Sequence, residues 1–367
     1  MTVVSTPTGV ASDPCSKVEG SQQDDAHLEL FVPGRLCLFG EHSDWAGSYR
    51  RLNEDIPPGR AIVVGTEQGL YARVSLLAEP MLIMTATTDT GEVEGPHAFP
   101  LTDAQTLVRV AAQRGFWSYI AGVAYKIVTE HHVEGGLRID NYRTTLPLKK
   151  GLSSSAAVCV LVARAFNRMY GLKLTTRGEM EYAYSGERMT PSLCGRMDQA
   201  NAFGSVPVVL TFDGDALHVD SMHLGAALPL VLVDLRAAKD TVMILAQLQA
   251  GYPAPDLPEH QELHDLLGHT NQRITMQAMQ LMRQGNAEKL GALMTEAQRA
   301  FDEKAGPCCP AQLRAPVLHK VLSYERIQPL IWGGKGVGSQ GDGTAQLLCR
   351  SEEAQAQLLQ RCRVTAR

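Results

Sequence analysis

Three consecutive serines in PLKKGLSSSAAVCV, residues 147–160, stand where they could bind phosphate. Gly151 lets the backbone turn and approach a ligand closely, and the apolar run after the serines predicts a helix. A helix start has unpaired backbone N–H groups and a partial positive charge, which suit an anion. The hydroxyls of Ser153–Ser155 add donors for phosphate oxygens, and one of them could ligate Mg²⁺. Because one serine is enough for an ordinary N-cap, the stretch favours phosphate binding.

The composition excludes several classes of protein. The chain has 367 residues, enough for two domains, and 44% of them are hydrophobic, enough for a sizeable core. A net charge of -5 with mixed signs argues against a nucleic-acid partner, and the absence of a long apolar run predicts no membrane span. Residues 1–25 lack the pattern of a secretory signal and are predicted to be a disordered tail. Eight scattered cysteines without zinc spacing favour a reduced, cytoplasmic protein.

The elements that must position the serines mix strands and helices. Strands are expected from His27 to near Gly40, as a pair over 61–78, up to Pro147, over 207–222 and over 229–237. Helices are expected over 106–131, from the serines to Gly171, over 176–189, within 260–304 and over 351–363. A glycine-rich loop is expected to lead into a strand over 334–350. This order predicts an α+β protein with an N-terminal domain over 26–205 and a C-terminal domain over 206–367.

Three segments, taken in order, make the chain resemble the GHMP kinase superfamily, and galactokinases within it. They are PGRLCLFGEHSDWAG (33–47), PLKKGLSSSAA (147–157) and GGKGVGSQGDGTAQLL (333–348). WSYIAGV (117–123) and CGRMDQ (194–199) resemble galactokinase segments, the second being the one that holds the catalytic base. The resemblance implies a two-domain GHMP kinase fold with an active-site cleft between the domains. It also implies an enzyme that transfers the γ-phosphate of ATP to a sugar, with Mg²⁺ as cofactor.

The resemblance assigns roles to residues of the phosphate site. Asp198 matches the catalytic base, and Arg35 matches a residue that pairs with this base and with the transferred phosphate. Ser154 and Glu187 match the Mg²⁺ ligands, although galactokinases usually have one residue more between Glu187 and Asp198, and this shorter spacing resembles mevalonate kinases. The implied ATP-binding residues are Lys150, Gly151, Leu152, Ser153, Ser154, Ser155 and Ala156.

The segment GEHSDW matches the part of galactokinases that binds sugar hydroxyls. Its carboxylates and imidazole suit a polyol, since each hydroxyl both donates and accepts. The chain departs from galactokinases at Cys37, where they have Asn, at Trp45, where they have Tyr, and in the polar insertion over 48–60. These departures leave the sugar unidentified, and the anomeric hydroxyl is the expected acceptor. The implied substrate-binding residues are Glu41, His42, Asp44 and Asp198.

The glycine-rich segment contains a literal G-x-G-x-x-G from Gly336 to Gly341. Only 26 residues follow it, too few for the rest of a Rossmann half-domain. It is not a Walker A motif, because Lys335 is followed by glycine. Lys335 and Asp342 are expected to be exposed loop charges.

Two other functions stay open at this point. One is a GHMP kinase of mevalonate type, and the other is a non-catalytic galactokinase relative that senses sugar and ATP. The expected partners are a monosaccharide and ATP, with no nucleic acid and no membrane.

Overall fold

The computed structural model describes residues 3–5, 27–148, 151–192, 194–252 and 254–364. The chain divides into two compact units. The N-terminal unit comprises residues 11–35 and 65–205, and the C-terminal unit comprises residues 1–10, 36–64 and 206–367.

This division differs from the predicted pair of continuous domains, because residues 36–64 pack with the C-terminal half. Two long strands explain the difference: β2 (Leu28–Phe39) and β3 (Gly59–Leu77) each pass from one unit into the other. Within the predicted disordered tail, β1 (Val3–Ser5) forms a strand that pairs with β9 (Leu230–Asp234). The rest of that tail lies outside the described residues.

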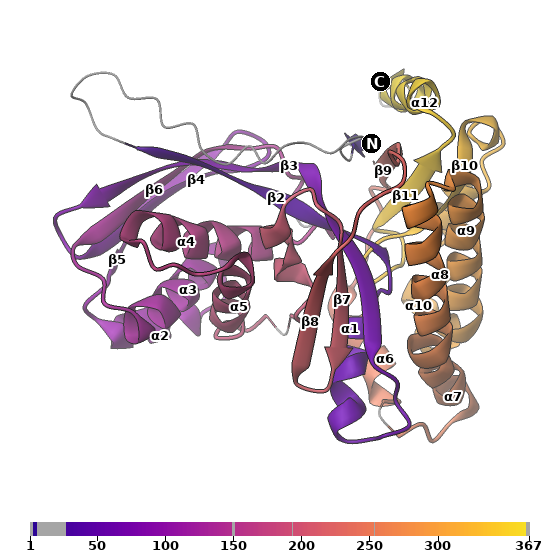
Figure 1. Cartoon of the computed structure of the whole chain (residues 1–367), viewed down its shortest axis with the longest axis horizontal. Coiled ribbons are helices and arrows are strands. Elements are labelled where there is room, and N and C mark those ends of the chain that lie inside the picture. The colour runs from indigo at the N-terminus through magenta and orange to yellow at the C-terminus, as the bar shows by residue number, and fades with distance from the viewer. Residues whose placement is uncertain (1–2, 6–26, 149–150, 193, 253, 365–367) are drawn as a thin grey trace. The chain divides into compact units, whose positions relative to one another are not determined.

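The N-terminal unit is a sheet with helices on one face. Its strands follow the order β5-β4-β6-β3, and β2 pairs with β3. Besides β2 and β3, its elements are β4 (Met81–Thr87), β5 (Val93–Pro100), α2 (Ala104–Ala111), α3 (Phe116–Glu130), β6 (Gly136–Thr144), α4 (Ser154–Tyr170), α5 (Thr176–Glu187) and the 3₁₀ helix η2 (Asp198–Phe203). Figure 1 shows α2–α5 together on one side of the strands, and alternate residues of β4 are buried, as expected for a strand with one covered face.

Two expected elements of this unit are different in the structure. The predicted strand pair over 61–78 is a single strand, β3, because its glycines mark close backbone approaches instead of a turn. A Cβ on Gly65 would lie 2.3 Å from the carbonyl oxygen of Gly204. The predicted helix over 106–131 is two helices, α2 and α3, because Gly115 between them has a φ of 134°.

Helix α4 fastens the segment that contains Asp198. Its residues 156–167 are buried apart from Arg164, and Gly171 ends it with a φ of 58°, as predicted. Arg164 Nε donates to Glu179 on α5 at 2.8 Å, and its Nη2 donates to the carbonyl oxygen of Ala202 in η2 at 2.6 Å. The same side chain therefore ties α4 to α5 and to the 3₁₀ helix that begins at Asp198.

The C-terminal unit contains an antiparallel sheet of order β1-β9-β11-β10 and a group of helices. Its strands, besides those named, are β7 (Val208–Asp213), β8 (Ala216–Ser221), β10 (Ile331–Gly336) and β11 (Thr344–Cys349). Its helices are α1 (Ser43–Ser48), α6 (Thr241–Ala250), α7 (Pro258–Asp265), α8 (Asn271–Gln284), α9 (Ala287–Lys304), α10 (Pro310–Leu313), α11 (Pro316–Leu322) and α12 (Glu352–Val364). Short turns of 3₁₀ helix are η1 (Tyr49–Arg51), η4 (Gly306–Cys308) and η5 (Gln328–Leu330), and η3 (Leu266–Thr270) is a π-helix.

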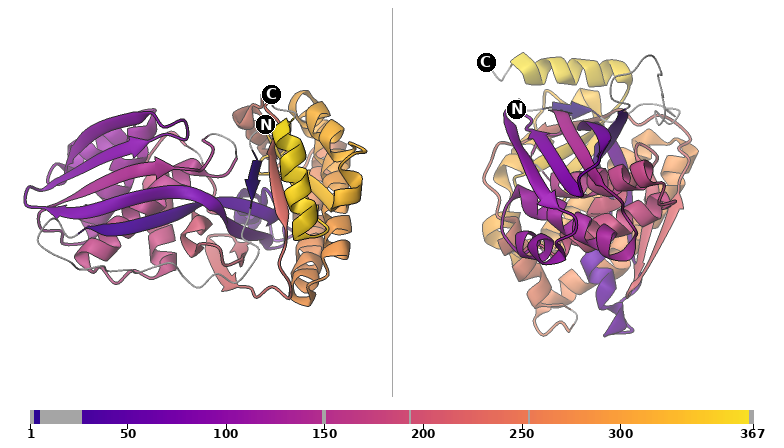
Figure 2. Two further views of the ribbon diagram at one scale, coloured as in Figure 1. Left: turned by 90° about the horizontal axis from the view of Figure 1, so that it is seen from above. Right: turned by 90° about the vertical axis from the view of Figure 1, so that its left-hand side faces the viewer.

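Helices cover this sheet closely. Figure 2 shows α12 lying along β9, and Leu358 of α12 packs with Val231, Val233 and Leu347 of the strands in one buried cluster. On β10, a Cβ at Gly333 would lie 2.0 Å from a carbonyl oxygen of α9, so only glycine allows this approach. The predicted glycine-rich loop with a following strand is thus a hairpin of β10 and β11. The α+β fold class is confirmed.

Among the described residues, no helix is both long enough and apolar enough to pass through a bilayer. The cysteines whose side chains the structure describes, Cys37, Cys159, Cys194, Cys308, Cys309 and Cys349, are in the free form.

Candidate active site

The predicted base and the predicted phosphate-binding arginine contact each other in the N-terminal unit. Arg35 lies on β2 and Asp198 begins η2, and Arg35 Nη2 donates to Asp198 Oδ1. The arginine side chain is buried, whereas 29% of the Asp198 side chain is exposed. The backbone N–H of Arg35 donates to the carbonyl oxygen of Leu152 at 3.0 Å, which joins this pair to the serine stretch. The carboxylate of Asp198 is therefore held by a fixed guanidinium and remains accessible.

The serine stretch has an unusual backbone. Gly151 has a φ of 77°, and Ser153, the N-cap residue of α4, has a φ of 57°. A left-handed residue other than glycine costs about 1–3 kcal/mol, and such residues cluster at functional sites. The Ser153 side chain makes no capping hydrogen bond, so the N-cap explanation of the serines is not supported. Ser153–Ser155 are half-buried, and Lys150 lies outside the described residues.

Glu187 ends α5 and is fully buried beside Asp198. Gln199 Nε2 donates to Glu187 Oε2 at 2.8 Å, and Oε1 has no hydrogen-bond partner of normal geometry among the described residues. Burial and the charge of Asp198 raise the pKa of Glu187 to about 7, although the nearby hydroxyl of Ser155 pulls it down. A buried carboxylate oxygen left unpaired near a hydroxyl fits Mg²⁺, which prefers oxygen ligands. The hydroxyl near Glu187 is that of Ser155; the predicted ligand Ser154 is its neighbour at the start of α4.

In the C-terminal unit, Glu41 forms a buried ion pair that the sequence did not predict. Lys335 Nζ donates to Glu41 Oε1, and it also donates to the carbonyl oxygen of Gly336 at 3.1 Å. Only 2% of the Lys335 side chain is exposed, so the expectation of an exposed loop charge is wrong. The reason is that residue 335 lies within β10, with its side chain in the interior of the unit. Asp342 is also not a free loop charge, since it accepts from the backbone N–H of Leu318 at 2.8 Å and caps α11.

His42 is buried and neutral. It has a φ of 65° before α1, and its Nδ1 accepts from the indole N–H of Trp45 at 3.0 Å, which places the ring proton on Nε2. Its ring stacks on Phe301 with the centroids 5.8 Å apart. Burial, followed by the charges of Lys239 and Lys335, lowers the pKa of His42 to about 3.

Asp44, by contrast, is half-buried in the first turn of α1. The polar insertion that follows it is anchored in the unit. Tyr49 and Trp45 pack on Tyr252 with ring centroids 5.7 and 5.4 Å apart, and Ile56 is buried. The insertion therefore contributes to the core of the C-terminal unit.

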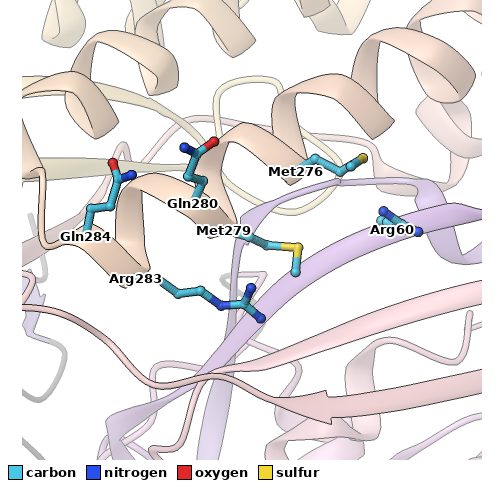
Figure 3. A pocket seen from close by; sticks show the side chains of 6 residues that line it. All are labelled: Arg60, Met276, Met279, Gln280, Arg283 and Gln284. Carbon is cyan, nitrogen blue, oxygen red and sulfur yellow. The ribbon is translucent and has the colours of Figure 1, made fainter.

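A separate groove of about 350 Å³ lies on the surface of the C-terminal unit (Figure 3). It runs along one side of α8 and faces Arg60 of β3. Its other lining residues are Met276, Met279, Gln280, Arg283 and Gln284. None of these belongs to the predicted site.

Comparisons with known proteins agree with the resemblance. Residues 118–205 match the family "GHMP kinases N terminal domain". The galactokinase of Thermococcus kodakarensis is 24% identical over 306 residues, which cover 77% of this chain and 80% of that protein.

Two solved structures share the fold. The Lactococcus lactis galactokinase in complex with galactose has a TM-score of 0.66 at 18% identity, covering 92% of this chain and 90% of its own. The L. major mevalonate kinase in complex with R-mevalonate has a TM-score of 0.64 at 18% identity, covering 90% of each chain. The resemblance to GHMP kinases and to galactokinases is confirmed, as is the GHMP kinase fold; the cleft between two domains stays a prediction.

Proposed function

We propose that this chain is an ATP-dependent sugar kinase that transfers the γ-phosphate of ATP to the anomeric hydroxyl of a monosaccharide. The observation that carries the proposal is the grouping of Asp198, held by buried Arg35, with Glu187 and the uncapped start of α4. Phosphoryl transfer needs little covalent help from a protein and depends on positioning and on neutralised phosphate charge. These residues are suited to both tasks.

In the proposed mechanism, Asp198 accepts the proton of the acceptor hydroxyl. The hydroxyl oxygen then forms a bond to the γ-phosphorus while the bond from this phosphorus to the bridging oxygen of ADP breaks. Arg35 keeps Asp198 in place and stabilises the charge of the transferred phosphoryl group. When bound, Mg²⁺ would be held by Glu187 with a hydroxyl from Ser154 or Ser155, and it would neutralise phosphate charge. The backbone N–H groups at the start of α4 bind the ATP phosphates.

The acceptor is proposed to be a sugar bound by the segment 41–44. Within it, Asp44 is the accessible carboxylate and binds sugar hydroxyls, whereas Glu41 and His42 are buried. Galactose is the first sugar to test, since the relative named above is a galactokinase. A mevalonate-type kinase is the second candidate, because the spacing between Glu187 and Asp198 resembles that class.

The test is a coupled ADP-release assay with ATP and Mg²⁺ against free hexoses, pentoses, uronic acids and mevalonate. The position of the product phosphate is then read by NMR. We expect turnover with a sugar and a phosphate at the anomeric carbon. Turnover with mevalonate alone would favour the second candidate, and a folded protein that phosphorylates none of these acceptors would overturn the proposal.

Asp198→Asn tests the base. It keeps the side-chain shape and should lower kcat by roughly 10²–10⁴, with little change in ATP affinity. Asp220→Asn, on the exposed surface of β8, is the matched control and should leave kcat unchanged. Near-normal turnover by the Asp198→Asn protein would remove Asp198 from the mechanism.

A further inference from the structure

Glu41 and Lys335 are paired inside the C-terminal unit and not at its surface. Glu41 is 7% exposed and Lys335 is 2% exposed. Charges are rarely buried without a partner, because each loses its hydration, and a buried pair persists only when its remaining donors and acceptors are also satisfied. The Oε1 atom of the Glu41 carboxylate is therefore engaged by Lys335 in this structure.

A network of glutamines surrounds the pair and holds it. The carbonyl oxygen of Gly336, which accepts from Lys335, also accepts from Gln340 Nε2 and Gln346 Nε2, each at 3.4 Å. The backbone N–H of Gly336 donates to Gln298 Oε1 at 2.7 Å. All of these side chains are buried. Moving Lys335 away from Glu41 would disrupt several buried hydrogen bonds, which are costly to leave unmade.

The space beside the pair is too small for a sugar. A cavity of about 10 Å³ is lined by Glu41 and Lys335, together with Asn271 and Phe301. A volume of this size accommodates at most about one water molecule. A sugar ring therefore has no room in the space beside the carboxylate and the ammonium group.

The pair fixes the backbone that leads to Asp44. Asn271 Nδ2, directly after the π-helix η3, donates to the carbonyl oxygen of Glu41 at 3.2 Å. Glu41 is thus held by its side chain and by its main chain. The next residue, His42, turns the chain through a left-handed conformation into α1, whose first turn contains Asp44. The direction of the Asp44 side chain therefore depends on how Glu41 is held.

We propose that Lys335 is a positioning residue of the acceptor site, which holds Glu41 as an internal anchor so that Glu41 places Asp44 and does not contact the sugar. This inference rests on the proposed function and differs from what the galactokinase resemblance implies for Glu41. It follows that Asp44 is the only carboxylate of the segment 41–44 that reads the acceptor.

The test combines Glu41→Gln, Lys335→Met and the double variant with a panel of deoxy-sugars, using the full chain with ATP and Mg²⁺. Lys335→Met should raise the acceptor KM by roughly tenfold or more and leave the ATP KM unchanged. The reason is that it removes the partner of Glu41 and leaves a buried carboxylate unpaired in the network that places Asp44. The double variant should recover part of this loss, since it no longer buries an unpaired carboxylate. Lys289→Met, at an exposed position of α9, is the matched control and should change neither KM.

The deoxy-sugars distinguish a residue that contacts the sugar from a residue that only positions another side chain. Removing any one sugar hydroxyl should raise the acceptor KM of the wild type and of Glu41→Gln by the same factor. In Asp44→Ala, removing at least one of these hydroxyls should no longer raise the acceptor KM. The inference would be overturned if removing one hydroxyl raised the acceptor KM of the wild type but not of Glu41→Gln. It would also be overturned if the effects of Glu41→Gln and Lys335→Met on the acceptor KM were additive. If Lys335→Met does not fold, the Glu41→Gln comparison still decides. Absence of sugar turnover by the wild type overturns the proposed function and this inference with it, whereas turnover with additive effects overturns only the inference.

Discussion

The buried carboxyl of Glu187 should give the protein a pH-dependent stability that Glu187→Gln lacks. Burial, and then the charge of Asp198, raise the pKa of Glu187 from 4.5 to about 7. At about 1.4 kcal/mol for each pH unit between these values, the ionised side chain costs the folded protein about 3 kcal/mol. This is about a fifth to three fifths of the 5–15 kcal/mol by which domains are typically stable.

The sign follows from which state binds the proton more tightly. The folded protein holds the Glu187 proton up to a pH of about 7, whereas the unfolded chain releases it near 4.5. The stabilisation is fully present below pH 4.5 and is lost as the pH rises through 7. Glutamine does not titrate, so the stability of Glu187→Gln relative to wild type should rise by about 3 kcal/mol between these pH values and then stay level.

Urea unfolding at several pH values, with EDTA and without nucleotide, measures this difference. Glu288→Gln, at an exposed position of α9, is the matched control. Its free energy of unfolding relative to wild type should not change with pH. In an Asp198→Asn background the rise should be smaller and should level off at a lower pH, because the like charge beside Glu187 is gone and the folded-state pKa is lower. Mg²⁺ with ATP should then stabilise the wild type more than Glu187→Gln at high pH, since the metal binds the ionised carboxylate. A difference that stays flat within about 1 kcal/mol from pH 4.5 to 8 would refute the reasoning.

Two further predictions concern the loops. Gly151→Val should fold but bind ATP weakly: no atom lies within 4 Å of a Cβ at this exposed position, yet a φ of 77° is strained for valine. Calorimetric titration with ATP and Mg²⁺ checks this, and unchanged affinity would mean that the loop does not hold the nucleotide. Asp44→Ala should raise the sugar KM by roughly tenfold or more while sparing the ATP KM, because a hydrogen bond to a charged acceptor contributes about 1.5–3 kcal/mol. Steady-state kinetics with each substrate varied in turn decides this, and equal changes in both KM values would contradict it.

Local patterns predicted many of the regular elements, but they did not predict β4, β5, α1 or α6, and they also failed where a glycine has more than one explanation. The helix that ends at Gly171 was predicted because its apolar run stops at a residue that tolerates the left-handed conformation. Gly65 lies inside a strand where another backbone approaches, and Gly115 separates two helices. Periodicity alone does not distinguish a glycine needed for close contact from a glycine needed for a turn, because the contact partner, here Gly204, is far away in the sequence.

The resemblance named Arg35, Glu187 and Asp198, and the structure brings these three together. It did not name Gln199, although this residue is next to the predicted base and holds the Glu187 carboxylate. A signal was present in the sequence, since a buried carboxylate needs a donor and CGRMDQ supplies an amide beside Asp198. The geometry of the pairing could not be predicted, because it depends on where α5 ends relative to η2.

The two ion pairs of the candidate site show what kind of information the sequence lacked. Arg35 with Asp198 and Lys335 with Glu41 both join residues that are far apart along the chain, separated by 163 and 294 positions. The first pair was predicted because a known motif assigns both partners. The second was missed because a lysine among glycines is usually a loop charge.

Lys335, however, lies in a strand whose partner strand contains Gln346, and polar side chains inside paired strands must find partners in the interior. A buried lysine there requires a buried anion, and the structure supplies it from Glu41, the residue that galactokinase resemblance assigns to the sugar. The cavity beside this pair has room for about one water molecule, which is too little for a sugar ring. Glu41 therefore pairs with Lys335 where the resemblance would have it bind the sugar. We expect this chain to differ from galactokinases in this contact to the acceptor.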